Sequence, residues 1–134
     1  FKLYLVDIGL LRVLSGLDAS IFSEKNKIFS EFKGALTENY ILQSLLTQFS
    51  GIPRYWTSDG QAEVDFLFQY KNRIIPCEVK SSENTKSRSL TVYAQKYKPA
   101  IRIRYSLLNL SMEGDLLNIP LFLADRTKNI LDKL

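Results

Sequence analysis

Polar and apolar residues alternate along two neighbouring segments in the middle of the chain, 63–70 and 73–80. Alternation over this length is typical of β-strands with one buried and one exposed face. Two polar residues, Lys71 and Asn72, separate the segments, so the pattern predicts a β-hairpin with its turn at that point. The position of this turn determines which residues of the two segments lie opposite each other.

Charged residues collect on one face of this predicted hairpin. Counting back from the turn puts Asp65 opposite Glu78 and Glu63 opposite Lys80. Side chains placed so have Cβ atoms about 4.5–5.5 Å apart, where like charges are destabilising. Two carboxylates at about 5 Å repel by on the order of 3 kcal/mol at an effective dielectric constant of about 20. A divalent cation bound between them would turn this repulsion into attraction.

Apolar residues at helical spacing predict a principal helix from about residue 28 to residue 49, ended by Gly51 and Pro53. Shorter helices are expected at 8–14 before Gly16, across 90–97 before Pro99, and at 126–134. Strands are expected at 2–6, 54–57, 100–105 and 116–119, the last at a sheet edge, and loops or turns at 18–27, 58–60 and 81–86. The order of helix, strand, hairpin, helix and strand predicts an α/β fold, a mixed β-sheet flanked by α-helices.

Composition narrows the chemistry. The 134 residues are 46% hydrophobic, which is enough for the core of a single domain spanning 1–134. The sequence holds no histidine and a single cysteine, Cys77, which excludes histidine metal sites, a Ser-His-Asp triad, a cysteine zinc cluster and an internal disulfide. Among metal sites, the composition leaves those in which carboxylates bind a hard cation.

The ends and the hydropathy of the chain bear on its location. No apolar run reaches the roughly 18 residues of a membrane span and no secretory leader is visible, so we expect a cytoplasmic protein without a membrane segment. Because the chain starts at Phe1 rather than at a methionine, we expect it to be a fragment of a longer protein.

Glu38 lies on the apolar stripe of the predicted principal helix, between Ala35 and Leu42. A buried charge is costly unless it is protonated, paired or bound to a metal. Glu38 is therefore a further metal ligand, a partner of a lysine such as Lys80, or a helix-edge residue that reaches water. Lys80 shares the face of Glu78, where an ammonium could orient a water or neutralise charge on a phosphate. Mg²⁺, or Mn²⁺ in its place, suits such a site because it takes few carboxylate oxygens and keeps several waters.

Basic residues are concentrated between residues 80 and 104. This segment carries seven lysines and arginines against one acid, Glu83, so its net charge is +6 while the rest of the chain is −2. A basic stretch beside an acidic cluster suits a protein that attracts a nucleic-acid backbone. The alternative is an ordinary solvated helix face. The candidates for phosphate contacts are Lys86, Arg88, Lys96, Arg102 and Arg104.

A helical Glu38 followed by Asp65 and then by Glu78-Val79-Lys80 resembles the ordered pattern of the PD-(D/E)xK nuclease superfamily, with Val64 where the name-giving proline would stand. The resemblance reaches a narrower family, the C-terminal domain of uncharacterised function carried by many bacterial and archaeal AAA-type ATPases. The runs that carry it lie at 2–11, 34–39, 55–58, 63–66 and 77–82.

This resemblance implies a restriction-endonuclease-like fold, with Glu38, Asp65, Glu78 and Lys80 at the metal-ligand and catalytic-lysine positions. It also implies an ATPase region upstream in the same chain. The sequence printed here has no Gly-x-x-x-x-Gly-Lys-Ser/Thr run, so ATP binding by that route is not expected of it.

Two functions are consistent with these features. The first is a Mg²⁺-dependent nuclease domain acting on DNA, with Asp65 and Glu78 as direct ligands, Glu38 as an additional or water-mediated ligand, Lys80 positioning the nucleophile and Glu63 in support. The second is a non-catalytic module that binds DNA or a protein and regulates the attached ATPase. Nucleases of this fold commonly form homodimers. The aromatic residues Tyr55, Trp56, Phe66 and Phe68 are expected in the core, the alternative being a dimer or base-stacking surface.

Overall fold

The computed structural model describes residues 2–16, 27–59, 62–82 and 86–134, without the side chains of residues 27–31. Its helices are α1 (Ile8–Leu14), α2 (Lys27–Leu46), α3 (Arg88–Tyr97) and α4 (Thr127–Leu131), with a 3-10 helix η2 (Leu121–Arg126) before α4. Its strands are β1 (Arg54–Thr57), β2 (Glu63–Tyr70), β3 (Arg73–Val79), β4 (Arg102–Ser106), β5 (Ser111–Glu113) and β6 (Leu116–Pro120). Residues 18–26, 60 and 83–85 of the predicted loops and turn lie outside the described part of the chain.

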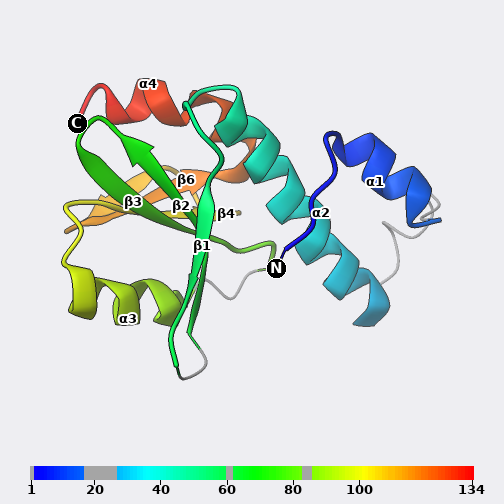
Figure 1. Ribbon diagram of the computed structural model, residues 1–134, viewed down its shortest axis with the longest axis horizontal. Coiled ribbons are helices and arrows are strands. Elements are labelled where there is room, and N and C mark those ends of the chain that lie inside the picture. Colours follow the sequence, from blue (N-terminus) through cyan, green and yellow to red (C-terminus); the bar gives the residue numbers. More distant parts are fainter. Residues whose placement is uncertain (1, 17–26, 60–61, 83–85) are drawn as a thin grey trace.

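The six strands form one mixed sheet in the order β1-β2-β3-β4-β6-β5. Strands β1, β2 and β3 are antiparallel, whereas β4 lies parallel to both β3 and β6. Helices α2 and α4 cover one face of the sheet and α3 covers the other (Figure 1). The predicted α/β fold with a mixed sheet between helices is confirmed.

The predicted hairpin is confirmed in its turn and register. Tyr70 pairs with Arg73 across the turn, where Lys71 takes a φ of 52°. The last pair of this ladder is Phe66 with Cys77. Beyond it the two strands separate, so Asp65 and Glu78 are the first residues past the end of the pairing.

A β-bulge in β2 changes which residues face which side of the sheet. Between the pairs Arg54 with Leu67 and Trp56 with Val64, β1 advances by two residues while β2 advances by three. The extra residue lets Val64 and Leu67 pack together against α3, although an odd spacing would separate them in a regular strand. Past the bulge the alternation that the sequence predicts no longer holds.

The two faces of the sheet hold cores of different size. The face under α2 and α4 carries the main core, which contains Ile41 and Leu45 of α2 and Phe66, Phe68, Ile75, Cys77, Ile103, Tyr105, Leu117 and Ile119 of the strands. The face under α3 carries a smaller cluster of Val64, Leu90 and Tyr93, with Trp56, Leu67 and Leu116 packed against it. The core prediction is confirmed for Phe66 and Phe68; Trp56 is half-buried, and Tyr55 is exposed.

Two predicted strands differ from the structure. Residues 2–6 form no strand, because the backbone of Leu5 bonds to the side chain of Asn39 rather than to another strand. The segment at 116–119 is a strand but not an edge, because the short β5 pairs with β6 from the outside.

The principal helix ends at Leu46 rather than at residue 49, since the amides of Gln48 and Phe49 both turn back to the carbonyl of Leu45.

Among the described residues, none of the helices combines the length and the apolar character that crossing a bilayer requires.

Candidate functional site

The predicted site residues lie around the point where β2 and β3 separate. The carboxylate of Asp65 accepts a hydrogen bond of 2.8 Å from the backbone N–H of Val79. This bond ties Asp65 to the middle of the Glu78-Val79-Lys80 run. The gap between the diverging strands is therefore bridged by an acidic side chain instead of a further backbone pair.

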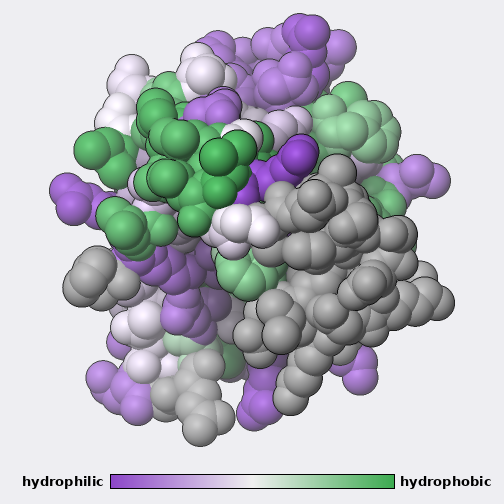
Figure 2. Space-filling model, turned by 90° about the vertical axis from the view of Figure 1, so that its right-hand side faces the viewer, coloured by the Kyte–Doolittle hydropathy of each residue, from purple (hydrophilic) through white to green (hydrophobic). Residues whose placement is uncertain are grey.

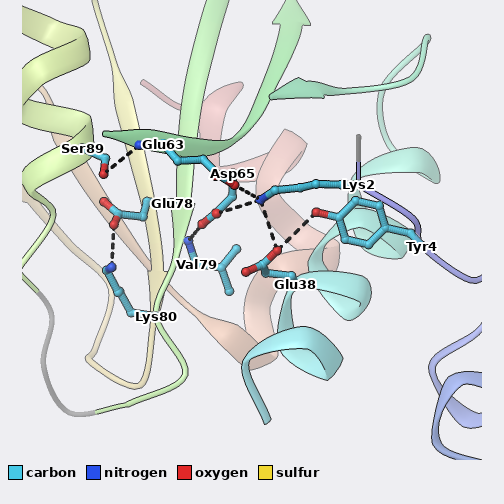
Figure 3. Close-up of polar contacts among 9 residues, drawn as sticks. All are labelled: Lys2, Tyr4, Glu38, Glu63, Asp65, Glu78, Val79, Lys80 and Ser89. Atoms are coloured by element: carbon cyan, nitrogen blue, oxygen red, sulfur yellow. Dashed lines mark hydrogen bonds and ion pairs between the residues drawn. The ribbon is translucent and has the colours of Figure 1, made fainter. Parts of the chain in front are cut away.

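Three acids form what we call the acidic cluster: Glu38 of α2, and Glu63 and Asp65 of β2. The ammonium of Lys2 lies among them. Its Nζ is 3.5 Å from Oε2 of Glu38 and 3.4 Å from Oδ1 of Asp65, and it forms a close ion pair with Glu63. Figure 3 shows all three contacts converging on this one nitrogen. Lys2 thus offsets the repulsion within the acidic cluster, whereas Glu78, the predicted neighbour of Asp65, pairs with Lys80 instead.

Lys2 is placed by the residues that follow it. The Tyr4 hydroxyl donates to Oε2 of Glu38 at 3.2 Å, and its ring lies 5.7 Å from the ring of Phe66. The Asn39 side chain then binds both backbone groups of Leu5, accepting from the N–H at 2.9 Å and donating to the carbonyl at 3.1 Å. Asn39 therefore does for this segment what a neighbouring strand would do.

The electrostatics of the cluster reflect burial and mutual repulsion. Burial, followed by the charge of Asp65, raises the pKa of Glu38 despite the opposing effects of Lys2 and Tyr4. Burial likewise raises the pKa of Asp65, although the Val79 amide and Lys2 act to lower it. Burial alone would lower the pKa of Lys2, but the surrounding carboxylates raise it overall. The charged forms of Glu38 and Asp65 are therefore destabilised by burial, and Lys2 offsets only part of this destabilisation.

Glu78 and Lys80 form a second group on the α3 face. Glu78 is 4% exposed, and its Oε1 lies 2.5 Å from Nζ of Lys80. Its Oε2 has no hydrogen-bond partner among the described residues. Arg104 is the register partner of Glu78 on β4, so a further basic residue stands beside this carboxylate on the same face. A buried carboxylate with a spare oxygen is costly for folding and points to a functional role.

The four predicted residues are thus brought to one region but not to one point. In Figure 3 the Glu78 carboxylate points toward Lys80 and away from Asp65, while Asp65 and Glu38 face Lys2. The expected opposition of Glu63 and Lys80 is not observed: Glu63 pairs with Thr57 and its side chain binds Lys2. The bulge in β2 is the physical reason why the four residues do not meet at one point. It interrupts the alternation of the strand and turns Asp65 toward α2.

The donor chemistry of the region suits a hard divalent cation, since it offers carboxylate oxygens and an unpartnered buried atom. No group of three or more ligating side chains in the described ranges is arranged to hold a metal ion. Mg²⁺, however, is held by as few as one or two carboxylates with waters and a substrate phosphate. Asp65 and Glu78 are the two acids at the point where β2 and β3 separate, and Asp65 would have to give up its contact with Lys2 to supply a ligand.

Lys2 is the residue that the sequence reasoning missed. The run 2–6 was expected to be a strand, and Lys80 was the only lysine considered as a partner for the acids. Two signals could have found it: the unbalanced negative charge at Glu63 and Asp65, and the alternation of Lys2 and Tyr4 with apolar residues.

The predicted phosphate-contact residues divide into two sets. Lys86, Arg88 and Lys96 are exposed, and Nζ of Lys96 lies 5.4 Å from the centre of the Tyr97 ring. Arg102 and Arg104 are half-buried within the sheet. Arg102 pairs with Asp115 at 2.5 Å, and Nε of Arg104 donates to Asn118 at 2.8 Å. The exposed set is therefore better placed for a phosphate backbone.

Comparison with known proteins gives one match. The model of a family described as Domain of unknown function (DUF4143) matches residues 33–122, about two thirds of the chain. This range contains every predicted site residue, but not Lys2. No curated protein and no solved structure matches the chain.

Proposed function

This chain belongs to the DUF4143 family of domains of unknown function, and we propose that it is a nuclease-like domain of the PD-(D/E)xK type. The proposed substrate is DNA, and the proposed setting is a cytoplasmic AAA-type ATPase that carries the domain at its C-terminus. The proposal rests on the ordered motifs and on the restriction-endonuclease-like arrangement that they imply within a mixed α/β sheet.

One observation carries the proposal. Where β2 and β3 part, Asp65 is bonded to the amide of Val79, while the buried Glu78 keeps one oxygen unpartnered and the other on Lys80. Two acids and a lysine at the open end of a hairpin are a costly arrangement with no benefit to folding that we can identify. Such arrangements are typical of sites that handle charged substrates.

The residues have distinct proposed roles. Asp65 would hold Mg²⁺ or Mn²⁺, and Glu78 would join it by turning its carboxylate from Lys80 toward Asp65 (Figure 3); the bound ion would polarise a phosphate and lower the pKa of a bound water. Lys80 would bind and orient the attacking water, and its charge would offset the negative charge that develops on the phosphate. Glu38 and Glu63 hold the Lys2 ammonium beside Asp65. Lys86, Arg88 and Lys96 would contact the DNA backbone.

Cleavage of DNA tests this function directly. Purified protein would be incubated with supercoiled plasmid in Mg²⁺, Mn²⁺ or EDTA, and nicked and linear products would be separated on gels. We expect metal-dependent nicking that Asp65→Asn and Lys80→Ala reduce by about 100-fold or more. The matched controls are Glu113→Gln on the exposed β5 and Lys133→Ala near the C-terminus, which should cleave like the wild type. Cleavage that survives both site variants would contradict the assignment.

A second function has one observation in its favour. Lys2 already neutralises part of the charge of the acidic cluster from within the chain. An acidic cluster neutralised from within the chain is what we expect of a non-catalytic module that binds DNA or a protein and regulates the ATPase. Its signature is the absence of nicking in wild type and in variants of Lys2, combined with measurable binding of duplex DNA or of the ATPase region.

A further inference from the structure

We propose that Lys2 is a removable internal counter-ion, and that the N-terminal arm, residues 2–16, is a plug that keeps divalent cations away from Asp65. This inference rests on the proposed function, because it concerns access to the same site. The plugged state is the one that the structure shows. Withdrawal of the arm would leave Glu38, Glu63 and Asp65 without a cation and open to one from solution.

Charge and position make Lys2 a competitor for a metal ion. Its ammonium contacts all three carboxylates of the acidic cluster, including Oδ1 of Asp65. A divalent cation on that oxygen and the ammonium cannot occupy the same space, and their like charges repel. Three carboxylates with one ammonium also leave an excess negative charge, which a divalent cation would balance better. Asp65 should therefore exchange Lys2 for a divalent ion once the arm is free to move.

The arm is attached in a way that permits this exchange. No residue of α1 is buried, and the arm presents Leu3 and Val6 to solvent with 82% and 84% of their surface exposed. Figure 2 looks onto the side of the molecule that carries α1 and shows apolar side chains exposed there. Segments with few buried apolar contacts open at low free energy. The packing of the Tyr4 ring on the main core, the polar contacts of Lys2 and Tyr4, and the Asn39 clamp on Leu5 hold the arm near the site.

The contact is also within reach of solvent. Lys2, Tyr4, Asp65 and Phe66 line a hollow of about 250 Å³ at the surface, together with Arg54 and Tyr55 among others. Lys2 and Asp65 line the hollow together, so an ion that enters it is close to the ammonium as well as to the carboxylate. Removing the ammonium, or loosening the clamp that places it, should therefore affect metal binding without altering any carboxylate.

Mn²⁺ binding in the absence of DNA tests the plug. Isothermal titration calorimetry would compare wild type with two variants that act differently: Lys2→Ala removes the ammonium, and Asn39→Leu removes the clamp but keeps Lys2. We expect Lys2→Ala to bind Mn²⁺ about tenfold or more tightly than wild type, and Asn39→Leu to lie between them. Lys133→Ala is the matched control, an exposed lysine that touches no member of the cluster, and should titrate like wild type.

Thermal unfolding gives an independent readout. In EDTA the Lys2→Ala protein should melt below wild type, because its three carboxylates face one another without a cation. Saturating Mn²⁺ should restore most of that loss, and should raise the wild-type melting temperature by less. If Lys2→Ala folds but binds Mn²⁺ no more tightly than wild type, the plug is wrong. Should that variant fail to fold even in Mn²⁺, Asn39→Leu decides: unchanged Mn²⁺ affinity there also overturns the proposal.

These outcomes separate the plug from the nuclease. Tighter Mn²⁺ binding by Lys2→Ala without any nicking of DNA would support the plug and contradict the nuclease function. Nicking by wild type, combined with an Mn²⁺ affinity that Lys2→Ala and Asn39→Leu do not change, would support the nuclease and contradict the plug.

Discussion

The two faces of the sheet hold their acidic side chains in different ways. On the α2 face, Glu38, Glu63 and Asp65 share a cation that arrives from the far end of the chain, Lys2. On the α3 face, Glu78 is more deeply buried and forms an ion pair with Lys80, only two residues away. The first arrangement depends on tertiary structure, whereas the second is set by strand alternation.

This difference shows on which face of the sheet an ion pair can break without disturbing the strands. The Lys2 contact can break without disturbing the sheet, because the arm carries it and the arm is lightly packed. Lys80 follows a central strand, and its backbone N–H bonds to the Tyr105 carbonyl on β4. We therefore expect the α2 face to be the adjustable side of the site and the α3 face to be the fixed side.

The largest effect on stability should come from removing the cation of the fixed side. Lys80→Met removes the ion-pair partner of the buried Glu78, which should lower the free energy of unfolding by about 3 kcal/mol. Lys2→Met leaves acids that are nearer to water and should cost about 1–2 kcal/mol. Urea denaturation at pH 7 measures both, and Lys133→Met provides an exposed control within about 0.5 kcal/mol of wild type. A larger loss for Lys2→Met than for Lys80→Met would reverse the comparison.

A smaller effect concerns pH, and it has opposite signs at two aspartates. The folded pKa of Asp65 is raised by burial, so its contribution to stability is complete below its ordinary value of 3.8 and is lost as pH rises through the raised value. The folded pKa of Asp115 is lowered by its hydrogen bond from Arg102, so its contribution is present above 3.8 and is lost as pH falls. Wild type should therefore lose stability relative to Asp65→Asn between pH 4 and pH 7.

The Asp115→Asn protein is the built-in control for that measurement. Relative to this variant, wild type should gain stability as pH rises from 3 to 5. Urea denaturation at each pH gives both differences. If the two aspartate variants show the same sign of pH dependence, the contrast between a desolvated acid and a surface ion pair is wrong.

The smallest expected effect concerns DNA affinity. Arg88 is exposed at the start of α3, so Arg88→Ala should weaken binding of a short duplex by a few fold and reduce the slope of log affinity against log salt by about 1. Arg102 is engaged by Asp115, so Arg102→Ala should leave DNA affinity near the wild-type value and lower stability instead. Fluorescence anisotropy over a salt series distinguishes them. Equal losses of affinity would show that the sheet arginines also reach the DNA.

Local pattern was enough to predict much of this fold. The alternation at 63–70 and 73–80 correctly predicted β2, β3 and their turn, and helical spacing correctly predicted α1 and α3. The apolar residues Phe66 and Phe68 were correctly expected in the core. These features depend on residues close together in sequence, whose period of alternation is read directly from the chain. The residue types of the site, carboxylates with a lysine, were also visible in this way.

What the sequence determined by itself was therefore the inventory: a hairpin with acids at its open end, helices on either side, and hard oxygen donors with no histidine. Only the tertiary structure decided how these acids are shared. One bulge in β2 turns Asp65 toward α2 and away from Glu78, and the Asn39 clamp on Leu5 holds the N-terminal arm where Lys2 reaches Asp65. A bulge depends on pairing with a neighbouring strand, and a clamp depends on contacts between distant residues. Neither feature produces a periodic pattern of polar and apolar residues that could be recognised in the sequence.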